Sequence, residues 1–334
     1  LILIGFAATY NIVGVEAQDN SVVFQSDFYL PNLPRSANGN PVCVEPDGRF
    51  VSNCDASGGL THFEQFNGLP CTAFDGSSGT VEIVHGVDYA IGFRCVTDDA
   101  LCDYGIALND TDASHAALAI DLCETTTSGT GSGVISASYV RADGTPLSPA
   151  LQAGITPLFG TNVTPQAGDR MLVLSTGHAR DVDDPDFCGN DSCAVSGIGT
   201  APPGFPFDIS GCSPLGTIND DVGLELTLRA PSDAKGFAFD FSFYTFDYPN
   251  FICGSYNDQA IVLMSPPPNG ASSGNISFDA QGNPITVNVG MEVCDGCLLG
   301  TTELVGTGFD SAGATGWLTT TAPVTGNQEF TLRF

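Results

Sequence analysis

The sequence is poor in basic residues and in histidine. Nine Lys and Arg stand against 38 Asp and Glu, which gives a formal net charge of −29, and there are only four histidines. A surface this acidic repels the phosphates of nucleic acids and of anionic membranes, so we exclude both as partners. Charged residues make up only 14% of the chain. Gly, Ser, Thr and Asn must therefore supply most of the polar surface.

The motifs of common enzyme and cofactor classes are also missing. The chain contains no GxSxG, no HExxH, no P-loop and no GxGxxG at a strand–helix turn. Only LSTGHARD brings candidate catalytic residues close together in sequence, namely Ser175, His178 and Asp181. Known triads assemble from distant segments, so we prefer a structural role for this loop and rank a secreted hydrolase third. We expect no enzymatic activity, no nucleotide and no haem.

Long apolar runs are absent after residue 17, and no later segment could span a bilayer. The start of the chain, LILIGFAATYNIVGVEA, is the exception, because residues 1–15 carry no charge. It could be a retained buried strand, the remnant of a secretion signal ending at V-E-A, or a short membrane helix interrupted by Gly5, Asn11 and Gly14. We favour the strand because apolar residues lie on both of its faces, and we expect no stable membrane insertion.

Glycine and proline are abundant, at 40 and 21 residues, and they separate short segments rich in β-branched and aromatic residues. This pattern predicts many short strands joined by turns. Leu224, Leu226 and Leu228 share one strand face, and the segment 237–243 places a phenylalanine at every second position. We expect one helix at 112–123 and a flexible connector at 125–133. The predicted fold is all-β, a β-sandwich or jelly-roll-like domain with one short helix.

Twelve cysteines, an even number, predict structural disulfides and an oxidising compartment. Local pairs Cys188–Cys193 and Cys95–Cys102 are plausible, and the remaining connectivity is open. Cys294 and Cys297 form a lone CxxC without the second pair of a zinc site or the histidine of a haem attachment site. The full set is Cys43, Cys54, Cys71, Cys95, Cys102, Cys123, Cys188, Cys193, Cys212, Cys253, Cys294 and Cys297.

Aspartates cluster in RDVDDPDFCGND (180–191), in INDD (218–221) and in FDYPNF to YND (246–258). Calcium prefers several oxygen ligands in loops of this kind. No segment has the regular EF-hand spacing, and a solvated acidic loop is the simpler interpretation. The calcium candidates are Asp181, Asp183, Asp186, Asp220, Asp221, Asp247 and Asp258, and the first loop also contains Asp184 and Asp191.

Residues from about 100 to 334 resemble the choice-of-anchor L domain family. The resemblance is carried by AGDRMLVLSTGHARD, by NDDVGLELTLRAPSDAKGFAFDFSFYTFDYPNFICGSYNDQAIVLM, by GNISFDAQGNPITVNV and MEVC, and by GTGF and ATGWLTTTAPV. It implies an exported β-rich domain of secreted and surface proteins of bacteria, with no catalytic residues to transfer. Such domains usually continue after the strand that matches EFTLRF with an apolar, aspartate-rich closing segment. Either the sequence is clipped at this point or the subunit lacks its last strand, and in the second case we expect an open groove near residues 326–334.

Three parts of the chain are expected: an apolar strand at 1–17, a disulfide-rich β unit at 18–98 and the sandwich domain at 99–334. Our leading hypothesis is a secreted structural subunit of a filament or fibre on a bacterial cell surface, which binds copies of itself by strand exchange. Residues 1–17 would be donated to the groove of a neighbour. The donor residues are Leu1, Leu3, Phe6, Tyr10, Ile12 and Val13.

The alternative hypothesis is a monomeric, calcium-dependent surface adhesin or carbohydrate-binding module with surface glycans as its ligands. Sandwich domains commonly bind sugars with loop aromatics and calcium. The aromatic candidates are Trp317, Tyr244, Tyr248 and Tyr256, although aromatic residues in strands are more often part of the core.

Overall fold

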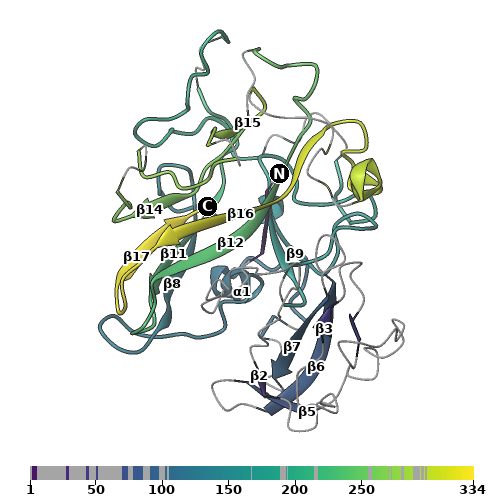
Figure 1. The fold of residues 1–334 in the computed structure, drawn as a ribbon. Helices are drawn as coiled ribbons and strands as arrows, with labels where there is room; N and C mark the ends of the chain where they lie inside the picture. The colour runs from purple at the N-terminus through teal and green to yellow at the C-terminus, as the bar shows by residue number, and fades with distance from the viewer. Residues whose placement is uncertain are drawn as a thin grey trace. The chain divides into compact units, whose positions relative to one another are not determined.

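The computed structural model describes the strands of residues 1–101 and most of residues 102–334 (Figure 1). Before residue 102 the described residues are 2–5, 28–29, 43–44, 50–51, 70–73, 78–85 and 91–97. After residue 101 the description omits residues 104, 167, 189–192, 194, 214–216, 255–257, 270, 272, 280–281, 289–293, 295–296 and 298. The chain forms two compact units: unit 1 comprises Leu1–Thr9 and Cys102–Phe334, and unit 2 comprises Tyr10–Leu101.

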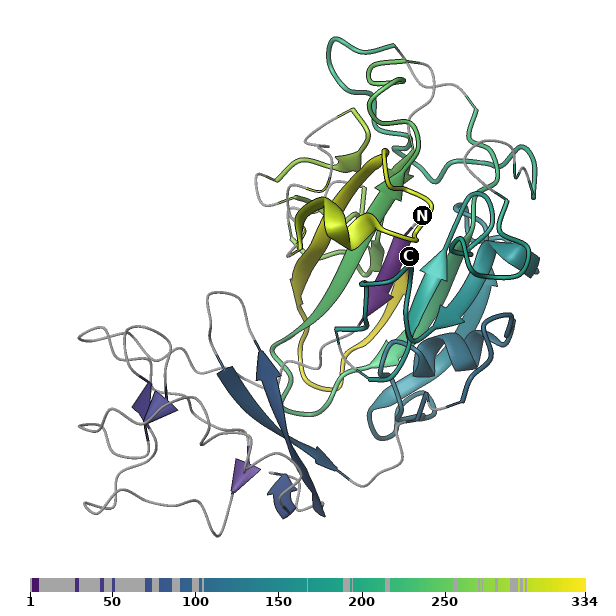
Figure 2. The same ribbon diagram turned by 90° about the vertical axis from the view of Figure 1, so that its right-hand side faces the viewer.

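The predicted all-β class is confirmed, because unit 1 consists mainly of two antiparallel sheets. The larger sheet has five strands, and every neighbouring pair in it is antiparallel. In spatial order they are β16 (Gly313–Pro323), β12 (Gly236–Thr245), β1 (Ile2–Gly5), β10 (Met171–Leu174) and β9 (Ala153–Thr156). Figure 2 shows β1 as the purple strand beside the green β12. The N-terminal strand is therefore the central strand of this sheet.

The second sheet of unit 1 has four strands. In spatial order they are β14 (Leu263–Ser265), β17 (Glu329–Arg333), β11 (Gly223–Arg229) and β8 (Gly133–Val140). A short antiparallel ladder joins β13 (Gln259–Ala260) to β15 (Ile285–Thr286). Leu224, Leu226 and Leu228 of β11 are all buried, as their alternation predicts.

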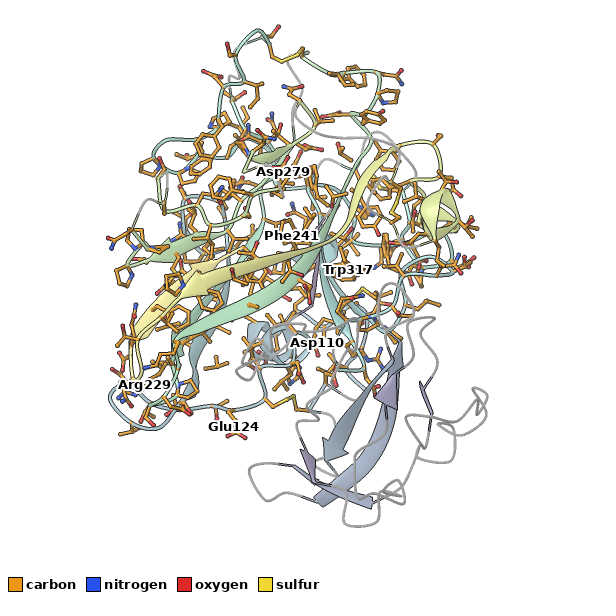
Figure 3. The ribbon with its side chains drawn as sticks, in the orientation of Figure 1. Asp110, Glu124, Arg229, Phe241, Asp279 and Trp317 are labelled. Atoms are coloured by element: carbon orange, nitrogen blue, oxygen red, sulfur yellow. A yellow bond between two sulfur atoms is a disulfide. The ribbon has the colours of Figure 1, made fainter. Side chains whose placement is uncertain are left out.

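Side chains from both sheets of unit 1 meet in one hydrophobic core. Phe239, Phe241 and Phe243 of β12 are at most 2% exposed and lie in this core, which confirms the predicted aromatic face (Figure 3). The ring of Phe237 stacks on Phe330 of the second sheet, with centroids 5.2 Å apart. Burying side chains of this size contributes about 1.5–3 kcal/mol each, so this layer stabilises unit 1.

The opposite face of the five-stranded sheet is covered as well. Met171, Val173 and Tyr244 lie in a second buried cluster together with Phe159 and Phe309 from the surrounding loops. β10 is therefore buried on both faces, which explains why its sequence, MLVL, is apolar without alternation. Two 3₁₀ helices, Ala150–Gln152 and Gly300–Leu304, belong to these loops.

The predicted helix is present but shorter than expected. α1 spans Ala113–Leu118, and the side chain of Asp112 caps it by accepting a hydrogen bond from the Ser114 N–H at 2.9 Å. The helix ends before Asp121, which adopts a left-handed φ of 65°. Among the described residues, no helix has the length and apolar character needed to span a bilayer.

The connector at 125–133 is held by specific contacts, so the expectation of a flexible linker is wrong. The Glu329 carboxylate of β17 accepts hydrogen bonds from the Ser128 hydroxyl at 2.9 Å and from the Gly129 N–H at 2.6 Å. The same carboxylate lies 3.3 Å from the guanidinium of Arg229. Glycine and serine permit the tight turn, and one glutamate fixes it against the sheet.

Unit 2 contains a four-stranded antiparallel sheet and a two-stranded ladder. The sheet consists of β2 (Phe28–Tyr29), β5 (Pro70–Ala73), β6 (Ser78–His85) and β7 (Ile91–Thr97). The ladder consists of β3 (Cys43–Val44) and β4 (Phe50–Val51). The division predicted at residues 98 and 99 lies near the boundary of this unit at Leu101.

Candidate assembly site

The position of β1 is defined by pairing on both of its sides. Ile2 lies opposite Leu174 of β10 and opposite Phe243 of β12. Ile4 lies opposite Leu172 and Phe241 in the same two strands. All four partners are at most 2% exposed. Directly opposed residues of an antiparallel pair share a face, so this position requires apolar residues.

The pairing of Leu3 and Gly5 further defines the register of β1 in the sheet. Leu3 lies opposite Val173 and Ser242, both buried, and Gly5 lies opposite Asp240. The Asp240 carboxylate accepts a hydrogen bond from the Thr319 hydroxyl of β16 at 2.5 Å. A shift by one residue would move each apolar residue to the other face, so the register is strongly specified.

β10 and β12 both pair with β1 and not with each other. If β1 left, each would present an unpaired row of backbone N–H and C=O groups inside the sheet. The other strands of this sheet, β9, β10, β12 and β16, all begin at Ala153 or later. The N-terminal residues therefore fill a one-strand gap in a sheet that the C-terminal part of the chain builds.

Within the stretch predicted as a strand at 1–17, the structure has a strand at Ile2–Gly5, which includes the predicted donor residue Leu3. The other predicted donor residues lie outside the described residues: Leu1, Phe6, Tyr10, Ile12 and Val13. The sequence did not lead us to predict that β10 and β12 flank β1. The continuous apolar run of β10 is nevertheless a signal for a strand buried on both faces.

The prediction of an open groove near residues 326–334 is wrong. β17 pairs with β11 on one side and with β14 on the other, so it is an interior strand of its sheet. Phe334 continues this pairing, because its N–H donates to the Leu224 carbonyl at 2.9 Å. β14, which follows β13 in the chain, is the neighbour of β17 in place of the later segment that the resemblance led us to expect.

In the acidic loop after β10, the carboxylates of Asp181 and Asp184 accept hydrogen bonds from backbone N–H groups. The buried Asp181 carboxylate accepts hydrogen bonds from the N–H groups of Gly160 at 2.8 Å and Asp183 at 3.0 Å. Asp184 accepts the Asp181 N–H at 3.0 Å, and burial raises the pKa of Asp184, with the charge of Asp181 adding to the effect. Asp183 and Asp186 are exposed, and Asp191 lies outside the described residues.

Asp220 and Asp221 fix the loop at residues 195–199. One Asp220 carboxylate oxygen accepts hydrogen bonds from three consecutive N–H groups, those of Val195, Ser196 and Gly197, at 2.6–2.8 Å. The buried Asp221 forms an ion pair with Arg141 at 3.0 Å. The surrounding structure thus gives both carboxylates a role in holding the loop.

Asp247 and Asp258 are brought together beside Thr245 at the end of β12. The Thr245 hydroxyl donates to the Asp258 carboxylate at 3.2 Å and accepts the Asp247 N–H at 3.1 Å. Burial, followed by the charge of Asp258, raises the pKa of Asp247 to about 6.

The described residues do not gather the calcium candidates into one site. Groups of at least three potential ligand atoms within 4.8 Å of one another are formed by His178 with Cys188 and Cys193, by Asp121 with Cys102 and Cys123, and by Glu303 with Cys294 and Cys297. In each group the two cysteines are joined in a disulfide. None of the candidate aspartates belongs to these groups, so calcium stays a prediction from the sequence.

The residues of LSTGHARD do not form a relay within the described part of the chain. The Ser175 hydroxyl accepts the Gly177 N–H at 3.0 Å. The His178 Nδ1 donates to the Asp186 carbonyl at 2.6 Å, while the Asp181 carboxylate binds backbone N–H groups. Each side chain is used to shape the loop.

The aromatic residues considered for sugar binding are largely core residues. Tyr244 is completely buried in the second cluster, and Trp317 and Tyr248 are half-buried against the two cores. Tyr256 lies outside the described residues. Tyr244 is therefore not exposed at the surface, where the alternative hypothesis of a glycan-binding module would require it.

Four disulfides lie within unit 1: Cys102–Cys123, Cys188–Cys193, Cys212–Cys253 and Cys294–Cys297. The predicted pair Cys188–Cys193 is confirmed. The predicted pair Cys95–Cys102 is wrong, because α1 folds the chain back and brings Cys123 to Cys102 with a Cα separation of 5.6 Å. The pairing of Cys43, Cys54, Cys71 and Cys95 lies outside the described residues. These disulfides are compatible with an extracellular protein.

Comparisons with known proteins found no match to this chain. No protein-family model matches the chain, and searches of curated proteins and of solved structures returned no match.

Proposed function

We propose that the chain is a structural subunit of an extracellular filament or surface fibre of a bacterium, and that subunits are joined by exchange of β1. In the fibre, β1 of one subunit would occupy the position between β10 and β12 of the next. One observation carries the proposal: an N-terminal strand of four residues pairs on both sides inside a sheet whose other strands begin at Ala153 or later.

The covalent order of the chain favours such an exchange. The segment with β1 ends at Thr9, and all of unit 2, Tyr10–Leu101, separates it from the rest of unit 1 at Cys102. Removing β1 therefore breaks no turn or hairpin between the remaining strands of unit 1. An exchanged strand makes the same contacts as before, now with another copy, which makes domain swapping a low-cost route to assembly.

Two further features support an extracellular location. The disulfides of unit 1 are typical of secreted proteins, and each can stabilise the folded subunit by about 2–4 kcal/mol. The resemblance of residues from about 100 to 334 to the choice-of-anchor L domain points to exported surface proteins of bacteria. Secretion, the fibre and this family assignment are parts of the proposal.

Deletion of residues 1–9, combined with a synthetic peptide of the same residues, tests the proposal. We expect the full-length chain to form fibres visible by electron microscopy, and the deleted chain to form none. The added peptide should bind the deleted chain and restore its thermal stability without restoring fibres, since it fills the position but links no subunits.

Fibres of unchanged repeat from the deleted chain would contradict the proposal. So would a full-length chain that stays monomeric at every concentration, which would instead favour the surface adhesin or carbohydrate-binding module. A peptide with Ile2, Leu3 and Ile4 replaced by serine is the matched control, and it should not bind because these residues pair with core residues on both sides.

A further inference from the structure

A histidine lies beside one of the disulfides of unit 1. A ring nitrogen of His178 and the sulfur atoms of Cys188 and Cys193 all lie within 4.8 Å of one another. The two cysteines are joined to each other, and none of the three side chains is buried. The exchange of β1 gives these residues no role. We call them the His178 cluster.

The imidazole of His178 is held in the tautomer that a metal ligand needs. Its Nδ1 donates to the backbone carbonyl of Asp186 at 2.6 Å, so in the neutral ring the lone pair lies on Nε2. Histidines that bind metals almost always donate their other ring N–H to a carbonyl, a carboxylate or water, because this bond fixes the ring and makes it a better ligand. This hydrogen bond is independent of the two sulfur atoms.

Contacts outside the disulfide hold His178 and the first cysteine in place. Directly after His178, the Ala179 N–H donates to the Leu151 carbonyl at 2.8 Å. Directly before the first cysteine, the ring of Phe187 lies so close to Gly308 that a Cβ on this glycine would be 2.8 Å from it. Both segments are therefore fixed by contacts that do not depend on the S–S bond.

The second cysteine is fixed in the same way. The segment before His178 passes close to it, because a Cβ on Gly177 would lie 3.2 Å from the Cβ of Cys193. Two residues after Cys193, the Val195 N–H donates to the Asp220 carboxylate at 2.8 Å. The three side chains of the His178 cluster therefore stay near one another when the disulfide is open.

This disulfide is also easier to open than the others in the described part of the chain. It spans five residues, whereas Cys102–Cys123 and Cys212–Cys253 span 21 and 41. A shorter loop gains less from closure, so its disulfide contributes less to stability. Cys294–Cys297 spans only three residues, but both of its cysteines are buried. Exposed disulfides are the ones that thiols reach.

Two thiolates and an imidazole select zinc rather than calcium. Zinc binds sulfur at ~2.3 Å and imidazole nitrogen at ~2.0–2.1 Å, and a tetrahedral site places such ligand atoms about 3.5–3.8 Å apart. The limit of 4.8 Å for the His178 cluster includes these separations. Calcium prefers oxygen ligands. The other two groups of this kind among the described residues combine their cysteines with a carboxylate and contain no histidine.

We infer that His178, Cys188 and Cys193 bind one Zn²⁺ when the two cysteines are thiols, and that closing the disulfide releases the ion. A newly synthesised chain carries thiols, which cytosolic reductants keep from pairing. Binding removes one proton from each thiol and uses the Nε2 lone pair of His178. Three protein ligands leave the fourth position of the zinc to water.

Release of the zinc accompanies oxidation by a molecule that itself contains a disulfide. The two thiolates form the S–S bond and give up two electrons. The oxidant takes these electrons and two protons from water to become two thiols, and the Zn²⁺ returns to solution. Metal binding and disulfide formation therefore exclude each other in the His178 cluster.

Zinc should shift the equilibrium between the Cys188–Cys193 disulfide and its thiols. The full-length chain is equilibrated in a glutathione redox buffer, with free Zn²⁺ set by a metal-ion buffer. Alkylation followed by peptide mass spectrometry then gives the thiol fraction at each cysteine. At free Zn²⁺ about ten times the dissociation constant, the thiol-to-disulfide ratio at Cys188 and Cys193 should rise about 10-fold. The ratio at Cys212 and Cys253, which belong to no metal-like group among the described residues, should not rise.

Two histidine variants separate the His178 cluster from general binding of zinc to thiols. His178→Gln removes the Nε2 lone pair and should abolish most of the rise. His115→Gln removes another partly exposed histidine and should leave the rise unchanged. Calcium in place of zinc should have no effect, because thiolates are poor ligands for it.

The unchanged chain alone can overturn the inference, if Zn²⁺ leaves the ratio at Cys188 and Cys193 as it was. An equal rise in His178→Gln, or an equal rise at Cys212 and Cys253, would overturn it as well. The inference does not rest on the proposed fibre, so each of these results leaves the exchange of β1 intact.

Discussion

Among single residues, the acidic side chains act mostly by accepting backbone hydrogen bonds. Asp181 and Asp220 bind N–H groups of their surrounding loops, and Glu329 binds the loop at Ser128 and Gly129. The sequence makes these residues look like a cation site, because it shows the carboxylates and not the N–H groups that they meet. Asp247 differs from them in that burial and a second carboxylate oppose its ionisation.

We predict that ionisation of Asp247 lowers the stability of unit 1. Its pKa is about 6 in the folded chain, above the ordinary value of 3.8. The folded state therefore binds this proton more tightly than the unfolded state does. The resulting stabilisation is fully present below the unfolded pKa and is lost as the pH rises through the folded pKa.

Urea unfolding between about pH 4 and pH 7 checks this prediction. Asp247→Asn should be more stable than the unchanged chain at the upper end of the range, and the difference should shrink towards the lower end. A constant difference across the range for Asp247→Asn would contradict the prediction.

Among the elements of the fold, β1 pairs with a neighbouring strand on each of its two sides. It is four residues long, yet it completes the pairing of both β10 and β12. Ile4→Asp places a carboxylate opposite the buried residues Leu172 and Phe241. We expect a loss of about 3 kcal/mol or more in unfolding free energy, because an unpaired charge is costly in an apolar layer.

Urea unfolding followed by tryptophan fluorescence measures this loss, since Trp317 lies on β16 of the same sheet. Thr9→Asp adds the same charge beyond the residues that pair with β10 and β12. It should change the midpoint little. Equal effects of the two variants would mean that the pairing of β1 contributes little to the stability of unit 1.

The disulfides should contribute according to the length of chain that each closes. Cys102–Cys123 spans 21 residues around α1, and Cys188–Cys193 spans five. The entropy of loop closure predicts losses of about 3 and about 2 kcal/mol when each pair is replaced by serine. Thermal unfolding of the two double variants measures the difference. A larger loss for Cys188–Cys193 would contradict this order.

For the whole molecule, net charge sets the conditions for assembly. Each copy carries −29 charges, so subunits repel one another until salt screens them. Raising the ionic strength from about 0.01 M to about 0.15 M shortens the screening length from ~30 Å to ~8 Å. We expect light scattering to show faster assembly over this range, with NaCl as effective as CaCl₂ at matched ionic strength. A clear excess for CaCl₂ would instead support the calcium prediction.

Local patterns in the sequence predict the strands, and contacts between distant segments decide how they are arranged. The alternation of Leu224, Leu226 and Leu228 and the aromatic face of β12 both follow from a period of two residues. The sequence contains no comparable signal that β1 pairs with β10 and β12, or that β17 lies inside its sheet. Cys102 shows the same limit, because its partner depends on the turn around α1.

A pair of engineered cysteines tests the exchange of β1 most directly. Leu3 lies opposite Val173, and directly opposed residues have Cβ atoms about 4.5–5.5 Å apart, near the separation that a disulfide needs. Fibres of the Leu3→Cys/Val173→Cys variant should yield a ladder of covalent multimers on a non-reducing gel, and neither single variant should. Cross-linked fibres that run only as monomers would show that β1 stays in its own subunit, which contradicts strand exchange.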